Sequence, residues 1–208
     1  MNAKSSDALA GHRNRLEQLG RFFMGTSDVH QALRRLCGKL DELGIPYAIC
    51  GGLAVNAHGH LRATTDVDVL LDPEGLRRFK ENSLGLGWLE RFAGSRGVED
   101  TDRGIPIDVL LAGGIPGDGT PRGVVFPEPG DASVEIDGYR YLELGKLVEL
   151  KLAAGLSAPD RPRDFDDVIQ LIRANSLTED FADRLHPYVQ AKYHELLGYA
   201  QNETRLPE

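Results

Sequence analysis

Apolar positions along the chain change their spacing several times, and these changes mark out helices and strands. Residues 28–43 follow a three-four spacing, which predicts an amphipathic helix. Ser27 or Asp28 can cap its start, and Gly44 can close its end. Short apolar runs bounded by glycine or polar residues predict strands instead. We expect strands at residues 46–50, 66–71, 88–92, 105–112, 133–136 and 139–143.

Helical spacing returns at several points, above all in the last third of the chain. Pro73 stands at the favoured first position of a helix, and Asp137-Gly138 is typical of a hairpin turn. The stretch 113–130 is rich in glycine and proline and predicts a loop. Helices are expected at residues 6–23, 53–58, 73–83, 145–155, 163–174 and 187–202.

These elements together predict an α/β (α+β) fold, in which helices flank a mixed sheet. No internal repeat is found in the sequence. We expect three parts: an N-terminal helical extension (1–27), a sheet domain (28–143) and a C-terminal helical region packed on it (144–208).

Composition and charge narrow the class of protein. Hydrophobic residues make up 41% of the chain and charged residues 27%, as in ordinary globular proteins. The N-terminal residues and the lengths of the apolar runs predict neither a signal peptide nor a membrane span. Cys37 and Cys50 are the only cysteines, which favours a reduced, cytoplasmic protein. The net charge of −8 weighs against broad binding of duplex nucleic acid, but not against a small anionic substrate that arrives with metal ions.

Three aspartates are candidates for a metal site. Asp66 and Asp68 are separated by one residue in a predicted strand, so their carboxylates lie on the same face and repel each other unless a cation joins them. Asp108 interrupts the apolar run 105–112, where a buried unpaired carboxylate would be costly. If the two strands are neighbours, three carboxylates can hold two ions about 3.5–4 Å apart, and Mg²⁺ prefers such oxygen ligands. The alternative is that all three are surface charges at strand ends.

The same residues belong to a longer pattern that resembles a known family. Gly51-Gly52, the run RATTDVD from Arg62 to Asp68, and Ile107-Asp108-Val109 resemble the nucleotidyltransferase superfamily of DNA polymerase β type. The similarity is greatest to its minimal nucleotidyltransferases and the AbiEii-type toxins of toxin–antitoxin systems. It covers residues 28–112, and a weaker likeness continues through 146–167.

This resemblance implies an enzyme that transfers a nucleoside monophosphate from an NTP to a hydroxyl and releases pyrophosphate. Asp66, Asp68 and Asp108 would be the catalytic and metal-binding residues, with two Mg²⁺ ions or, alternatively, Mn²⁺. In many members the acid that matches Asp108 also activates the acceptor hydroxyl. The acceptor could be an RNA 3′ end, a protein hydroxyl, or a small molecule such as an aminoglycoside.

The resemblance also implies a set of nucleotide-binding residues. The Gly51-Gly52 turn would meet the triphosphate; many members have Gly-Ser there, but backbone N–H groups at such a turn can still bind phosphate. Arg62 could clamp phosphate in a forked geometry, and the Thr65 hydroxyl could assist. Ordinary turn chemistry before a strand is the alternative for both.

Lys151 is unusual because it falls in the middle of the apolar arc of its predicted helix. A lysine there needs an anionic partner, which could be the triphosphate or Asp164 on the next helix. The resemblance slightly favours phosphate. The spacing of His58 and His60 is weak for zinc, and Asp166-Asp167 is interpreted as a solvated helix face.

Two other function classes compete with the enzyme reading. The chain could be a catalytically silent member of the superfamily that serves as a binding or antitoxin-like partner, for which the absent serine is mild support. It could also be an unrelated metal-dependent hydrolase that uses the same carboxylates. Dependence on an NTP with release of pyrophosphate would separate these alternatives.

Overall fold

The computed structural model describes residues 17, 19–22, 24–158 and 161–202. The predicted N-terminal helical extension lies largely outside them, although residues 17 and 19–22 are helical. Within the described ranges the helices are α2 (Asp28–Glu42), α3 (Gly51–Ala57), α4 (Pro73–Ser83), α5 (Leu144–Ser157), α6 (Pro162–Ala174), the 3-10 helix η1 (Glu179–Arg184) and α7 (Pro187–Asn202). The strands are β1 (Ala48–Ile49), β2 (Val67–Leu71), β3 (Trp88–Glu90), β4 (Val98–Asp100), β5 (Ile105–Leu111), β6 (Ser133–Ile136) and β7 (Tyr139–Leu142).

In the described part of the chain, seven strands form one mixed sheet in the order β3-β4-β5-β2-β1-β7-β6. The central pair, β2 and β5, runs parallel, as do β1 and β7, whereas every other neighbouring pair is antiparallel. The predicted mixed sheet with flanking helices is therefore confirmed. The register of the central pair places Asp68 opposite Asp108.

The core forms because β2 and β5 are apolar except for one aspartate each, Asp68 and Asp108. Val67, Val69 and Ile107 are fully buried, and α2 contacts both strands. The apolar face of α2 contributes Leu36 and Leu40, which are equally buried. Ser27 caps α2, since its hydroxyl accepts a hydrogen bond from the His30 N–H. One face of the central strands thus packs against α2, and the carboxylates of Asp68 and Asp108 lie on the opposite face.

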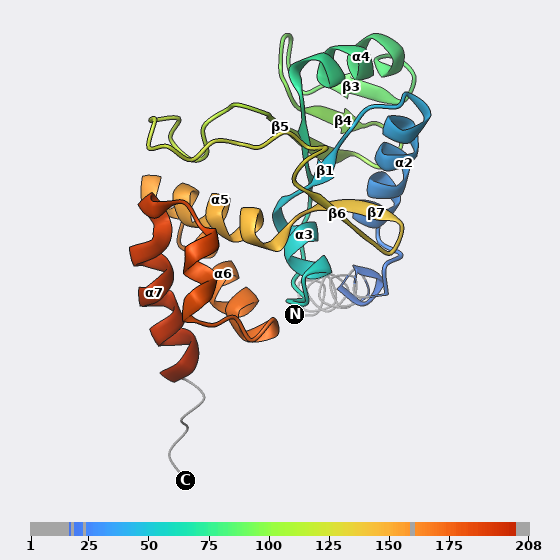
Figure 1. Ribbon diagram of the computed structural model, residues 1–208. Coiled ribbons are helices and arrows are strands. Elements are labelled where there is room, and N and C mark those ends of the chain that lie inside the picture. The colour runs from blue at the N-terminus through green and yellow to red at the C-terminus, as the bar shows by residue number, and fades with distance from the viewer. Residues whose placement is uncertain (1–16, 18, 23, 159–160, 203–208) are drawn as a thin grey trace, which may run out of the picture.

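The C-terminal helices pack on one another and gather at one side of the sheet (Figure 1). Helix α5 is buried almost all round, including Glu149 and Ala153, which its sequence pattern would leave on a polar side. The reason is that α6 and α7 both contact α5, so it has a second buried face. The Glu149 carboxylate accepts hydrogen bonds from the His186 N–H and the Lys146 ammonium, which satisfies its charge in this setting.

Some boundaries differ from those predicted from the sequence. Helix α3 begins at Gly51, so both glycines are helical residues and not part of a preceding turn. Strand β4 was not predicted, because Val98-Glu99-Asp100 is too short and too acidic to show an alternating pattern. Its Asp100 is buried and pairs with Arg35 from α2. No helix in the described part of the chain combines the length and the apolar character that a membrane crossing requires.

Candidate active site

Asp66, Asp68 and Asp108 come together at the edge of β2 and β5. Asp68 and Asp108 are register partners on the parallel strands, and Asp66 comes directly before β2. One carboxylate oxygen of each lies within 4.8 Å of the others. The same-face spacing and the apolar flanks of Asp108 predicted this meeting, which is confirmed. Oxygen ligands at this separation suit a hard divalent cation.

The electrostatics of the cluster show that it favours added positive charge. Burial, together with the neighbouring Asp66 and Asp108, raises the pKa of Asp68 to about 6 against the opposing effect of Lys151 and Arg62. A carboxyl group with a raised pKa is one whose anion lacks sufficient compensation in the folded chain. A bound cation would supply that compensation, so the donor set fits a divalent metal.

Gly51 fits closely against Asp68. Its φ of +56° lies in the left-handed region, and a Cβ at this position would come 1.7 Å from the Asp68 Oδ2. Only glycine therefore allows α3 to start this near to the carboxylate. The sequence singled out this residue through the family pattern, and the structure gives a physical reason for it.

Gly52 stands where many members of the resembling family have a serine. In this protein a side chain at position 52 would meet Thr64. A Cβ at position 52 would lie 2.9 Å from both Cβ and Oγ1 of Thr64. The Thr64 hydroxyl, which donates to the Asp66 Oδ1 at 2.6 Å, thus lies where a side chain at position 52 would extend. Thr65, the threonine preferred from the sequence, is exposed, and the hydroxyl that contacts Asp66 belongs to Thr64.

Arg62 joins the loop before β2 to the helical region. Its Nε and Nη2 donate to the two carboxylate oxygens of Asp167 at 2.7 and 2.9 Å, a forked pairing. Asp167 lies on α6 and is fully buried, so its interpretation as a solvated face is wrong. Burial opposes ionisation of Asp167, but Lys151 and Arg62 outweigh it and lower its pKa. Contact between Arg62 and phosphate stays a prediction.

Lys151 is buried and has two carboxylate partners on α6. Its Nζ lies 2.6 Å from Asp167 and 3.1 Å from Asp164. Asp164 also accepts from Arg161 at 2.9 Å. The structural pairing considered from the sequence is therefore present, with Asp167 as an additional and shorter partner. Contact between Lys151 and a triphosphate stays a prediction.

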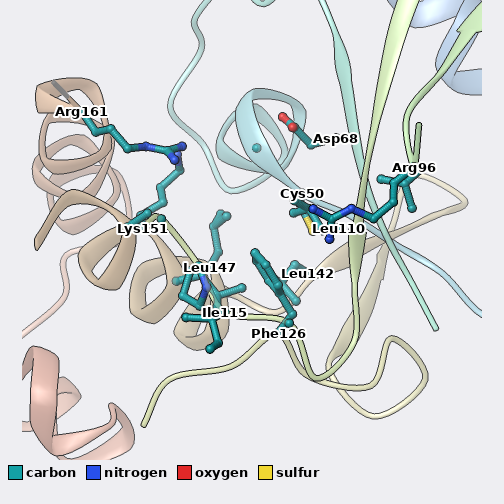
Figure 2. A pocket seen from close by; sticks show the side chains of 17 residues that line it. Cys50, Asp68, Arg96, Leu110, Ile115, Phe126, Leu142, Leu147, Lys151 and Arg161 are labelled. Atoms are coloured by element: carbon teal, nitrogen blue, oxygen red, sulfur yellow. The ribbon is translucent and has the colours of Figure 1, made fainter. Parts of the chain in front are cut away.

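A cavity of about 300 Å³ reaches Asp68 of the aspartate cluster and is lined by residues from the sheet, the 113–130 loop and α5. Figure 2 shows Asp68 at its upper side, Lys151 and Arg161 at one side, and Arg96 entering from the opposite side. Its floor is apolar and includes Phe126. The volume is at the small end of ligand pockets, which suits part of a nucleotide and not the whole.

Two arginines at this site were not found from the sequence. Arg91, just after β3, donates from Nη1 to the Asp108 Oδ1 at 2.6 Å. Arg96, from the same connection, lines the cavity. The only sequence signal was the run RFAGSRG, which carries two arginines and no acid.

His58, whose spacing from His60 is weak for zinc, makes a different contact in the structure. Its ring Nε2 lies 2.8 Å from the Leu142 carbonyl oxygen.

Comparison with solved structures identifies the fold. ANT(2″)-Ia in complex with adenylyl-2″-tobramycin matches with a TM-score of 0.51 and 16% identity, covering 84% of this chain and 97% of that one. The solution structure of the antibiotic-resistance factor ANT(2″)-Ia matches with a TM-score of 0.51 and 15% identity, covering 83% and 94%. A protein from H. pylori, assigned as a nucleotidyltransferase, matches with a TM-score of 0.46 and 16% identity over 86% and 97%. The sequence matches no protein-family model and no curated protein.

The sheet order and the two matches to ANT(2″)-Ia define one class of structure. The chain shares its fold with ANT(2″)-Ia, and its mixed sheet with flanking helices is the fold that its sequence pattern led us to expect. Within that class it is similar to ANT(2″)-Ia over most of its length, at a level of identity that establishes the shared fold and leaves the substrate to be argued from the site.

Proposed function

We propose that this protein is a Mg²⁺-dependent nucleotidyltransferase that transfers a nucleoside monophosphate from an NTP to a hydroxyl acceptor. The observation that carries the proposal is the register of Asp68 with Asp108 on neighbouring parallel strands, with Asp66 beside them. Three carboxylate oxygens within 4.8 Å of one another are a poor arrangement for stability and a good one for divalent cations. Gly51, which has no side chain, lets the start of α3 lie directly against Asp68.

In this proposal Asp66, Asp68 and Asp108 hold Mg²⁺, with Mn²⁺ as the alternative. The metal would neutralise the triphosphate and make the acceptor hydroxyl a better nucleophile. The acceptor oxygen forms a bond to the α-phosphorus, the bond from that phosphorus to the oxygen bridging to the β-phosphorus breaks, and pyrophosphate leaves with the electron pair. Asp108, half exposed at the rim of the cluster, takes the proton of the hydroxyl.

The nucleotide would lie across the start of α3. Gly51 and Gly52 would meet the triphosphate, and Thr65 would assist, as the resemblance implies. Thr64 is the better placed hydroxyl, because it already touches Asp66. Arg62 and Lys151 would reach phosphate only by exchanging part of their pairing with Asp167.

The resemblance further supports a role as the toxin of a toxin–antitoxin system that acts on RNA in the cytoplasm. Induced expression tests this role separately from the chemistry. We expect growth arrest with the natural chain and normal growth with Asp68→Asn at equal protein level. Arrest by both proteins would point to a catalytically silent binding partner.

The direct test of the reaction uses each of the four NTPs labelled at the α-phosphate, with Mg²⁺ and a cell extract. We expect label to move from one NTP to an acceptor, with one pyrophosphate released per transfer and none with Asp68→Asn. Release of inorganic phosphate without labelling would instead favour a hydrolase. Identification of the labelled species gives the acceptor.

A further inference from the structure

We propose that the β3–β4 loop, residues 91–97, is the acceptor-binding element and that it binds the single-stranded end of a polynucleotide. This inference rests on the proposed nucleotidyl transfer, because it concerns the acceptor of that reaction. The loop connects two antiparallel strands at the edge of the sheet, and it reaches the aspartate cluster through its arginines. Nothing in the family pattern of the sequence points to this segment.

Arg91 fixes the side from which the acceptor enters. Its guanidinium is the group that touches Asp108, the carboxylate proposed to take the acceptor's proton. The side chains of the pair are 44% and 43% exposed, so the ion pair is accessible to solvent and contributes little to stability. An anionic group on an incoming acceptor can therefore draw Arg91 away at small cost. The same movement frees Asp108 for the acceptor hydroxyl.

Arg96 is a second cation on the same loop and has no acidic partner among the described residues. It lines the cavity from the side opposite Lys151 and Arg161, as Figure 2 shows. Those two cations are paired with carboxylates of α6, whereas Arg96 is an exposed residue. A site with an uncompensated arginine beside a catalytic carboxylate is suited to a hydroxyl that is flanked by phosphate.

The balance of charge around the loop supports this assignment. Residues 91–97 contain two arginines and no acid. The nearest acid before the loop, Glu90, is in an ion pair with Lys80. The nearest acid after it, Glu99, is exposed on β4 and offsets one of the two positive charges in part. The loop is therefore a small cationic element in a chain of net charge −8, large enough for a few phosphates and too small for a duplex.

Phe92 narrows the acceptor from a phosphorylated molecule in general to a polynucleotide. It lies between the two arginines in sequence and is 70% exposed, so its ring is accessible to a ligand that approaches the loop. Exposed aromatic rings among arginines are typical of surfaces that bind single-stranded nucleic acid, where bases stack on the ring. A polyamino sugar such as tobramycin would instead bring its ammonium groups beside two guanidinium groups, which repel them.

The test measures binding and transfer with the full chain. A 5′-fluorescent oligoribonucleotide of about 12 nucleotides and its DNA counterpart are titrated in Mg²⁺ with a non-hydrolysable NTP analogue. We expect Arg96→Ala and Arg91→Ala each to weaken binding about 10-fold. Each should also flatten the dependence of log affinity on log salt by about 0.7. Phe92→Ala should weaken binding about 5- to 50-fold.

Two control variants match these changes elsewhere on the surface. Arg140 is 46% exposed in a single 2.8 Å ion pair with Asp41, which closely resembles the setting of Arg91. Leu86 is 71% exposed and matches Phe92. Arg140→Ala and Leu86→Ala should bind the oligonucleotide as the natural chain does. Equal losses in the control and loop variants would overturn the proposal.

A separate measurement distinguishes failure of this inference from failure of the proposed function. Calorimetry with Mg²⁺ and the NTP analogue should give the same affinity for the natural chain and for Arg96→Ala. If the natural chain binds the NTP analogue but no oligonucleotide, the acceptor assignment alone is refuted. It is also refuted if Arg96→Ala loses affinity for the NTP analogue while it still binds the oligonucleotide. Absence of NTP binding in the natural chain refutes nucleotidyl transfer itself. When an NTP labelled at the α-phosphate replaces the analogue, transfer confined to the oligoribonucleotide would identify RNA, and equal transfer to DNA would show that the 2′-hydroxyl is not read.

Discussion

Replacing Asp68 with asparagine should stabilise the metal-free protein at neutral pH, even though it removes a proposed catalytic residue. Burial and two neighbouring aspartates raise the pKa of Asp68 from 3.8 to about 6. A raised folded-state pKa means that the folded chain binds more protons than the unfolded chain between these two values. The contribution of protonated Asp68 to the free energy of unfolding is therefore fully present below about pH 4, and it is lost as the pH rises through 6. A shift of about two units corresponds to about 3 kcal/mol.

The assay is denaturant unfolding in a chelator at several pH values between 4 and 8, with the natural chain and Asp68→Asn compared at each. The difference in unfolding free energy should grow by about 3 kcal/mol in favour of the variant as the pH rises from 4 to 7. This would be a melting-temperature difference of roughly 6–12 °C. Saturating Mg²⁺ should narrow the gap, because the ion binds the natural cluster more tightly. Asp131→Asn, at an exposed position outside the cluster, should show no such trend. A difference that does not change with pH would refute the electrostatic reasoning.

Three further predictions follow from the contacts around the cluster. Gly51→Ala should abolish transfer, because its Cβ would fall 1.7 Å from the Asp68 Oδ2; Gly44→Ala, with a similar φ and open space, should keep activity. Thr64→Val should lower the rate of transfer roughly 10-fold in a labelled-NTP assay, through loss of the 2.6 Å bond to Asp66, and Thr64→Ser should recover most of it. Lys151→Met should cost about 3 kcal/mol in denaturant unfolding, since Asp167 would stay buried with Arg62 as its remaining partner; an unchanged unfolding midpoint would contradict this.

The parts of the fold that the sequence predicted are those that depend on local pattern. The valines around Asp68 alternate with period two, and the apolar side of α2 repeats with helical spacing, so both elements and their buried faces were predicted. The meeting of Asp68 with Asp108 was also predictable, because an isolated carboxylate in an apolar strand needs a reason. The register that places them opposite each other comes from strand pairing, which no local pattern specifies.

The misjudged positions depend on contacts between distant segments. Asp167 was assigned to a solvated face from the apolar arc of its own helix, yet its partner Arg62 lies 105 residues away. The sequence pattern of α5 alone would leave Glu149 on a polar side, whereas α6 and α7 both pack against this helix. In each case a charged residue is buried by an element that the local sequence does not reveal.

The ion pairs that the basic residues already make determine which of them can bind a further anion without losing a partner. Lys151 drew attention because a lysine on an apolar face demands an anion, and the chain already supplies two carboxylates to it. A phosphate that recruited Lys151 would have to replace one of these, leaving a buried aspartate less well compensated. Arg96 faces the same cavity without such a partner among the described residues, so an anion that binds it disrupts no ion pair there. Binding of the acceptor's phosphates should therefore depend on the exposed arginines of the β3–β4 loop, whereas the main contribution of the buried lysine is to hold α5 against α6.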